Sequence, residues 1–265
     1  MKLLKQVHKG KQPRPRRLML YGVHGVGKSS MAAMAPRPIF IQTEDGLGDI
    51  ECEKFPLART YADVLAALSE LYAEEHEYRT VVVDSLDWLE RLIWAEVCRK
   101  RGVENIEDFG YARGYSFALG QWREVLEGLD ALRNERGMTV ILIAHARIER
   151  FENPETESYD RYVPRLHKLA SALVQEWCDD VLFATYRVHT RKVDESFGRA
   201  KHRGIGSGQR IVRTSERPAH VAKNRLNLPD EFPLDWRIYE AFARGDIEAA
   251  HRLIAEYGNT DRKTA

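Results

Sequence analysis

A glycine-rich run near the start of the chain constrains its fold more than any other feature. The run is Gly22-Val-His-Gly-Val-Gly-Lys28-Ser29, which matches the pattern G-x-x-x-x-G-K-[S/T] at every fixed position. Residues 17–21 before it predict a buried strand, and residues 30–34 after it predict the first turn of a helix. Strand, loop and helix together indicate a P-loop, whose successive backbone N–H groups bind the phosphates of a nucleotide.

Each residue type in this loop has an expected role. The glycines let the backbone approach a polyphosphate without a clash from a Cβ atom. Lys28 is expected to reach the β- and γ-phosphates of ATP, and the Ser29 hydroxyl is expected to join the Mg²⁺ shell. The expected nucleotide contacts are Gly22, Val23, His24, Gly25, Val26, Gly27, Lys28, Ser29 and Ser30. The alternative is a glycine-rich turn that binds nothing, and the matching strand and helix on either side argue against it.

Three further polar residues stand at the ends of expected strands. Asp84 ends the β-branched run 80–84, a Walker B pattern that would hold this carboxylate near Mg²⁺; alternatively, Asp84 caps the helix that follows. Glu44 follows an expected strand at 39–43, at the edge where open α/β sheets place their chemistry. His145 ends another buried strand and could sense the γ-phosphate, or it could be only a hydrogen-bonded structural residue.

Length and composition indicate a cytoplasmic protein with no membrane partner. The 265 residues are enough for one large α/β domain with appendages. Hydrophobic residues make up 43% of the chain, which permits an adequate core, yet no apolar run approaches the ~18 residues of a membrane span. The basic N-terminus lacks the apolar stretch of a secretory signal. Three distant cysteines form neither a zinc spacing nor a disulfide framework, which suits a reducing compartment.

Charge is distributed unevenly, although the net charge is only +1. Residues 42–79 carry ten acidic and three basic side chains, whereas residues 187–225 carry eleven basic and three acidic ones. In residues 146–168, basic side chains alternate with aromatic ones, a mixture suited to stacking the bases and holding the phosphates of a single strand. Segments 146–168 and 191–213 are therefore the candidate contacts for single-stranded DNA, and ordinary solvated loops are the alternative.

The remaining sequence alternates expected helices and strands. Helices are expected at 61–78, 86–101, 109–136 and 169–177, and a strand at 180–186. Further along we expect a mobile hairpin loop at 194–209, strand pieces at 210–213 and 219–223, and a small helical pair at 238–257. The expected organisation is a basic N-terminal arm at 1–16, an ATPase core at 17–235 and a helical tail at 236–265.

Over residues 16–235 these motifs resemble the RecA-like ATPase core. The resemblance implies a three-layer α/β fold with a mostly parallel central sheet, a C-terminal β-hairpin and a small helical tail. It also implies that Glu44 activates the attacking water and that His145 stands in the place of a γ-phosphate sensor, often Gln in this family. Lys223 and Arg225 are similar to the Lys-x-Arg pair that DnaB-like members insert into a neighbour's active site. Both are therefore expected to be catalytic within a ring or filament.

The ordered motifs, together with Ala222-Lys-Asn-Arg225, also resemble phage-encoded RecA-like nucleotide-binding proteins implicated in single-strand annealing recombination. This resemblance implies a Mg²⁺-dependent ATPase that binds single-stranded DNA and promotes annealing in the cytoplasm of a bacterial host. A single-strand DNA-binding protein is a candidate partner. Two alternatives stay open. One is a nucleotide-gated helicase loader or assembly factor with slow turnover; the other is a P-loop kinase for a small molecule, against which Glu44, Lys223 and Arg225 argue.

Overall fold

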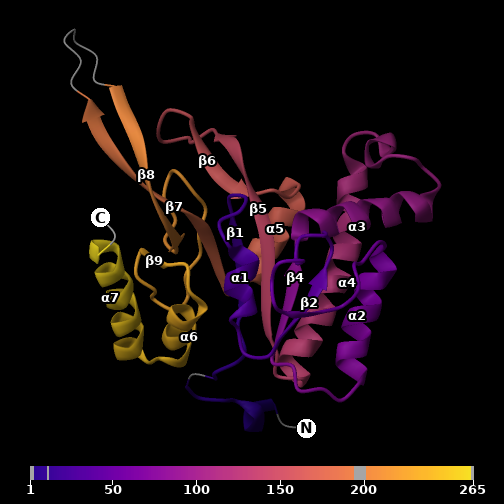
Figure 1. The fold of residues 1–265 in the computed structure, drawn as a ribbon. Helices are drawn as coiled ribbons and strands as arrows, with labels where there is room; N and C mark the ends of the chain where they lie inside the picture. The colour runs from indigo at the N-terminus through magenta and orange to yellow at the C-terminus, as the bar shows by residue number, and fades with distance from the viewer. Residues whose placement is uncertain (1–2, 11, 194–200, 264–265) are drawn as a thin grey trace.

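A nine-stranded sheet forms the centre of the computed structural model, which describes residues 3–10, 12–193 and 201–263 (Figure 1). The strands lie in the order β3-β2-β4-β5-β1-β7-β8-β9, and β6 pairs with the outer part of β5. Every neighbouring pair from β3 to β7 is parallel, and β8 and β9 continue the sheet antiparallel. The strands are β1 (Arg17–Gly22), β2 (Pro38–Gln42), β3 (Glu53–Lys54), β4 (Thr80–Asp84), β5 (Thr139–Phe151), β6 (Tyr159–Pro164), β7 (Asp180–Val193), β8 (Lys201–Arg213) and β9 (Glu231–Pro233).

The register of the parallel strands brings their polar ends to one edge of the sheet. Gly22, at the end of β1, pairs with His145 on one side and with Ala184 on the other. Asp84, at the end of β4, pairs with Gln42 of β2. Residues far apart in sequence therefore meet where the carboxyl ends of the strands lie side by side, which is where open α/β sheets bind ligands.

Helices cover both faces of the sheet and complete three layers (Figure 1). One face carries α2 (Tyr61–Ala73), α3 (Leu86–Arg101), α4 (Arg113–Glu135) and α5 (Lys168–Trp177); the other carries α1 (Lys28–Ala33), α6 (Trp236–Arg244) and α7 (Ile247–Lys263). The structure also has two short 3-10 helices, η1 (Leu3–Gln6) and η2 (Ile106–Phe109), and Ile106 of η2 joins the core beside α3 and α4. The architecture confirms the expected α/β fold with a mostly parallel sheet, a C-terminal hairpin and a helical tail.

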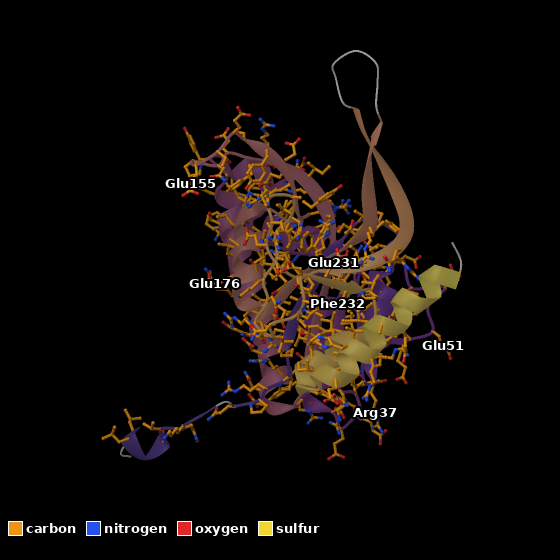
Figure 2. The ribbon with its side chains drawn as sticks, turned by 90° about the vertical axis from the view of Figure 1, so that its left-hand side faces the viewer. Arg37, Glu51, Glu155, Glu176, Glu231 and Phe232 are labelled. Carbon is orange, nitrogen blue, oxygen red and sulfur yellow. The ribbon has the colours of Figure 1, made fainter. Side chains whose placement is uncertain are left out.

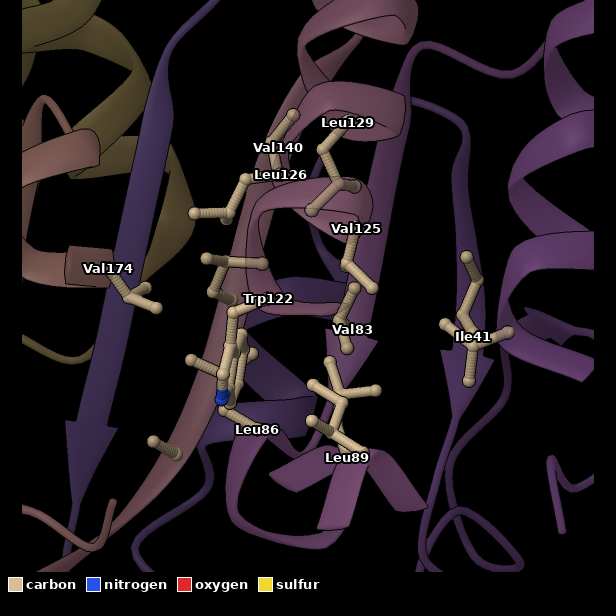
Figure 3. Packing of buried hydrophobic residues seen from close by; sticks show 14 of the residues in the cluster. Ile41, Val83, Leu86, Leu89, Trp122, Val125, Leu126, Leu129, Val140 and Val174 are labelled. Atoms are coloured by element: carbon tan, nitrogen blue, oxygen red, sulfur yellow. The ribbon is translucent and has the colours of Figure 1, made fainter. Parts of the chain in front are cut away.

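The larger core cluster lies between the sheet and helices α2 to α5. Figure 3 shows Trp122, Leu126 and Leu129 of α4 packed against β-branched residues of the sheet such as Val83 and Val140. Trp122 is 1% exposed and Leu129 is fully buried. Each such side chain contributes roughly 1.5–3 kcal/mol when it leaves water. This packing holds β4 and β5, and hence the residues at their ends, in a fixed register.

Helix boundaries follow local signals in the sequence. Thr60 caps α2 through a capping box with Asp63, and Gly102 ends α3 in a left-handed conformation at φ 66°. Helix α2 ends at Ala73, earlier than the expected 78, because Glu74 takes an extended conformation. Helix α4 begins at Arg113 rather than 109, after a turn that interrupts the expected helix.

Two segments expected to be irregular form antiparallel ribbons instead. Strand β5 continues six residues past His145 to Phe151 and pairs with β6, so residues 146–168 are mostly a hairpin rather than a loop. Strands β7 and β8 form a long hairpin that projects beyond the body of the molecule (Figures 1 and 2). Strand β8 begins at Lys201, so the expected loop at 194–209 was too long; residues 194–200 lie outside the described residues. Both ribbons leave the helix-covered part of the sheet, so their backbone pairing does not require an apolar face.

The segment at 219–223 forms only isolated bridges and no strand of its own, which corrects the expected strand piece. The helical pair α6–α7 packs into the second core cluster, where Trp236 and Tyr239 are buried. The division of the chain at residues 16 and 235 stays a prediction. Among the described residues, the helices include none with the length and apolar character needed to cross a bilayer.

Candidate active site

The P-loop connects β1 to α1, and its glycines serve two different purposes. A Cβ atom on Gly22 would lie 2.1 Å from the carbonyl oxygen of Ala184, so only glycine allows β7 to run beside the loop. Gly25 and Gly27 instead have positive φ angles of 69° and 99°, which side chains with a Cβ atom rarely adopt. The Val26 side chain is fully buried, so this residue offers only its backbone to a ligand.

The side chain of Lys28, which is expected to bind phosphates, lies inside the P-loop. Its ammonium group donates hydrogen bonds to the carbonyl oxygens of Gly22 at 3.3 Å and Val23 at 3.0 Å. The residue is only 6% exposed. Burial lowers the pKa of Lys28, and the negative charges of Asp84, Asp87 and Glu44 partly offset that effect. A cation held by neutral carbonyl groups is well placed to receive phosphate oxygens.

Ser29 and Asp84, the two residues expected to hold a metal ion, are in direct contact. Ser29 Oγ donates a hydrogen bond of 2.6 Å to Asp84 Oδ2, and Asp84 is 4% exposed. Burial raises the pKa of Asp84 more than this hydrogen bond lowers it. A hydroxyl and a carboxylate are the hard oxygen ligands that Mg²⁺ prefers, and a buried carboxylate gains from a nearby cation. The two residues therefore fit a magnesium ion.

Glu44 follows β2 and faces the same edge. Its Oε2 accepts a hydrogen bond of 3.0 Å from Ser85 Oγ, and its Oε1 lies 3.9 Å from His145 Nε2. Thr43 holds the segments after β2 and β4 together, because its Oγ1 accepts from the Ser85 N–H at 2.9 Å and donates to the Ser85 carbonyl at 2.7 Å. The glutamate is thus fixed beside the Asp84 strand.

His145 is held by a buried aspartate that the sequence did not reveal. Its Nδ1 lies 3.1 Å from both Asp87 carboxylate oxygens, and its backbone N–H also donates to Asp87 at 3.1 Å. Arg165, at the end of the β5–β6 hairpin, donates to Asp87 Oδ2 through two nitrogens, at 2.5 and 3.2 Å. Burial raises the pKa of Asp87, but the hydrogen bonds from His145 and Arg165 outweigh it and the pKa is lowered overall. Asp87 is therefore a carboxylate that orients the His145 ring.

Ligand atoms of Glu44, Asp87 and His145 lie within 4.8 Å of one another, and the ring of His24 stacks on that of His145 at 4.2 Å. Arg165 already neutralises Asp87, so the trio is better described as a positioning network than as a metal site. The structure thus places the P-loop, Glu44, Asp84 and His145 together at one sheet edge, as expected.

The other two expected catalytic residues, Lys223 and Arg225, lie at the opposite edge of the sheet, where β1 and β7 begin. Lys223 bridges to Val181 near the start of β7, and its ammonium group donates to three carbonyls at the end of α5, those of Gln175, Glu176 and Cys178, at 2.6–3.0 Å. Arg225 lies 3.4 Å from Asp179, and its side chain is 54% exposed. Neither residue reaches the P-loop of its own chain. Both lie beside the start of β7, where Asp180 pairs with Leu18 at the start of β1, whereas the P-loop follows the end of β1.

Two residues of the β7–β8 hairpin reach the P-loop instead. The Tyr186 hydroxyl donates to the Gly25 carbonyl at 3.1 Å, and a guanidinium nitrogen of Arg210 lies beside Gly27. No motif spacing marks these two residues; Arg210 appears in the sequence only as one of many bases in a basic segment.

Comparison with known proteins agrees with this geometry. A family model described as an AAA domain matches residues 14–226, which include the P-loop, Glu44, Asp84, His145 and the Lys223 segment. The chain belongs to this AAA-domain family. It is therefore an AAA-type P-loop ATPase domain, a class of domain that binds nucleotides.

Two similar proteins add to this comparison. The AAA-domain chain is 26% identical over 243 residues to the SPbeta prophage-derived uncharacterized protein YorG of Bacillus subtilis strain 168; the match covers 89% of this chain and 67% of that protein. The resemblance to phage proteins is therefore supported by a prophage-derived relative. A crystal structure of the RadB recombinase aligns with a TM-score of 0.43 and 13% identity, over 80% of this chain and 86% of that chain.

Proposed function

We propose that this protein is a Mg²⁺-dependent ATPase that binds single-stranded DNA and promotes annealing in recombination. One observation carries the ATPase part of the proposal. Lys28, the Ser29–Asp84 pair and Glu44 come from three separate strand ends and converge at one edge of the sheet. A phosphate-binding lysine, an oxygen pair for Mg²⁺ and a glutamate beside them are the parts that ATP hydrolysis requires.

The proposed reaction depends mainly on positioning and charge. Lys28 and the loop amides hold the β- and γ-phosphates, while Ser29 and Asp84 hold Mg²⁺, which neutralises phosphate charge when bound. Glu44 accepts a proton from the attacking water, and the Ser85 hydroxyl keeps the glutamate in place. His145, oriented through Nδ1 by Asp87, directs its Nε2 towards Glu44 and the γ-phosphate.

The two hairpins support the DNA-binding part of the proposal. Strand β5 runs directly from His145 into the β5–β6 hairpin, and β7 runs from beside the P-loop into the β7–β8 hairpin. The Arg161 guanidinium lies over the Phe151 ring at 3.8 Å. Basic and aromatic side chains combined in this way are typical of surfaces that bind single strands. Several arginines of β5 and β6 already have acidic partners, such as Arg147 with Glu149. DNA phosphates would compete with these acids for the arginines. Because each phosphate contact releases counterions from the strand, we expect affinity to fall steeply with salt.

The first experiment is ATP binding by Lys28→Ala, with Lys100→Ala as a matched control on the exposed side of α3. We expect the first variant to lose nucleotide binding with its fold intact, and the control to bind like wild type. Undiminished ATP affinity in Lys28→Ala would remove the P-loop assignment. Retention of single-stranded DNA at low salt, measured in the same samples, tests the second part of the proposal independently.

One observation favours a second candidate function. Two fingers were expected, that is, basic residues that enter a neighbour's active site. One of them, Lys223, is bound within its own chain by the carbonyl groups at the end of α5. An active site that lacks a finger hydrolyses ATP slowly, as in a nucleotide-gated loader or assembly factor that partners a helicase or a single-strand DNA-binding protein. Turnover that stays slow with saturating single-stranded DNA would favour this second function.

A further inference from the structure

A second basic side chain from the same chain lies at the P-loop. A Cβ atom built on Gly27 would lie 2.9 Å from Arg210 Nη1 and 3.8 Å from Arg210 Cζ. Gly27 directly precedes Lys28, and its positive φ angle places its backbone at the turn of the loop. The Arg210 guanidinium is therefore within contact distance of the backbone that would receive the phosphates.

Strand pairing fixes this position. Arg210 of β8 pairs with Tyr186 of β7, and residues directly opposite each other in an antiparallel pair project from the same face. The Tyr186 hydroxyl donates to the Gly25 carbonyl at 3.1 Å, and the Arg210 carbonyl accepts a hydrogen bond from the Leu234 N–H at 3.1 Å. The base of the hairpin thus contacts the P-loop at two points, Gly25 and Gly27.

Within the part of the chain that the structure describes, the charge of Arg210 has no partner. Among the residues that the structure describes, no hydrogen bond or ion pair involves its guanidinium, and the residue is exposed. Nearby arginines differ, since Arg187 pairs with Glu231 at 2.6 Å and Arg217 with Asp230 at 2.7 Å. A guanidinium held beside an anion-binding loop with no acid of its own is suited to bidentate contact with phosphate oxygens.

We propose that Arg210 binds the phosphates of the nucleotide in cis and is a specificity-determining residue for a polyphosphate ligand. The proposal rests on the function proposed above, because it assigns a further ligand contact to the same site. It also gives the base of the β7–β8 hairpin a direct contact with bound nucleotide, so nucleotide binding and hairpin position are coupled through one side chain.

The test compares the affinities of Mg²⁺-ATP and Mg²⁺-tripolyphosphate for wild type, Arg210→Ala, Arg210→Gln and Arg210→Lys. The control is Arg244→Ala, which removes the same charge from an exposed i,i+4 pair on α6. Arg244 lines a hollow with Arg79 and Thr139 at the far edge of the sheet. We expect Arg210→Ala and Arg210→Gln to weaken both ligands about tenfold or more, the loss of one charge-assisted contact. Arg210→Lys should lose less, and the control should match wild type.

Two results would overturn the assignment. One is unchanged affinity of both Arg210→Ala and Arg210→Gln for both ligands. The other is weakened binding of ATP with unchanged binding of tripolyphosphate, which would place the contact on the base or ribose. Failure of wild type to bind either ligand would instead overturn the proposed function itself. Because the Arg210 side chain is exposed, the thermal midpoints of the ligand-free variants should stay within about 2 °C of wild type, and Arg210→Gln preserves most of the side-chain length.

Discussion

Ser29 Oγ lies 2.6 Å from Asp84 Oδ2, although 55 residues separate the two in the chain. Strand β5 pairs with β1 on one side and with β4 on the other, and this brings the two residues together at one sheet edge. Asp84 is 4% exposed, and burial raises the pKa of its carboxyl group. A buried carboxylate of this kind weakens the ligand-free fold unless a cation neutralises it. If Asp84 binds Mg²⁺ as proposed, the ion should offset this loss of stability.

Asp84→Asn should separate these two effects. We expect the thermal midpoint of the ligand-free protein to stay the same or to rise by a few degrees, because a neutral amide avoids the cost of a buried charge. The gain in ATP affinity on adding Mg²⁺ should fall about tenfold or more, because an amide oxygen is a weaker ligand than a carboxylate. Thermal unfolding and ATP titrations with and without Mg²⁺ measure both. A variant that retains the full Mg²⁺-dependent gain would show that Asp84 is not at the metal.

Arg165→Ala should slow ATP hydrolysis without weakening ATP binding. Arg165 contacts Asp87, which in turn orients His145, so its loss leaves the ring less well positioned. We expect kcat to fall by about tenfold with KM nearly unchanged, the effect of losing a group that acts through another. Arg165→Lys should restore part of the rate, since a cation remains near Asp87. Equal losses in both variants accompanied by a lower thermal midpoint would indicate a structural role only.

The residues that could be placed from the sequence share one physical feature. Glu44, Asp84 and His145 each follow or end a run of apolar strand residues, and the carboxyl ends of parallel strands gather at one edge. Local patterns were therefore enough to predict their meeting with the P-loop.

Asp87, Arg165 and Arg210 could not be placed in this way. Arg165 and Arg210 reach the site on hairpins whose return paths depend on register, which a single sequence does not specify. The β5–β6 hairpin itself lacks the alternation of a half-buried strand, since Ile148 is 63% exposed and charged residues stand on both faces. The ends of regular strands are predictable here, and the ribbons beyond them are not.

Glu90→Gln should stabilise the protein at alkaline pH. Glu90 is 3% exposed, and burial raises its pKa to about 7 even though the His167 N–H donates to it at 2.9 Å. Between pH 4.5 and about 7 the unfolded chain loses this proton before the folded one does, so ionisation of Glu90 lowers stability as pH rises through that window. Above pH 7, ionisation of Glu90 lowers the free energy of unfolding by about 3 kcal/mol.

Denaturant unfolding of Glu90→Gln at pH 8 and pH 5 measures this effect. We expect the free energy of unfolding to exceed that of wild type by up to about 3 kcal/mol at pH 8 and by much less at pH 5. Glu127→Gln, an exposed change on α4, is the control and should show no such difference. A variant that is less stable than wild type at pH 8 would mean that the ionised carboxylate is favourable where it lies.

Lys223→Ala and Arg225→Ala should differ, although the two residues are neighbours in one motif. Lys223 holds three carbonyl groups at the end of α5, so its loss should lower the free energy of unfolding by about 1–2 kcal/mol. Arg225 is 54% exposed, so its loss should leave stability nearly unchanged. If Arg225 acts as a finger, Arg225→Ala should lower ATPase activity.

Mixing the Lys28→Ala and Arg225→Ala variants tests whether Arg225 acts between subunits. Lys28→Ala protomers lack a nucleotide site but retain the finger, whereas Arg225→Ala protomers have the site and lack the finger. We expect the mixture to hydrolyse ATP faster than the sum of the two alone, since mixed assemblies contain complete sites. Strict additivity at every ratio would exclude action in trans.

The convergence of the P-loop, Asp84 and Glu44 into one hydrolytic site is tested most directly by phosphate release from wild type and Glu44→Gln, with and without single-stranded DNA. Asp45→Asn, an exposed change at the next residue, is the matched control. We predict that Glu44→Gln binds ATP like wild type but releases phosphate at least about 100-fold more slowly, while Asp45→Asn stays near the wild-type rate. Phosphate release by Glu44→Gln at the wild-type rate would contradict the account.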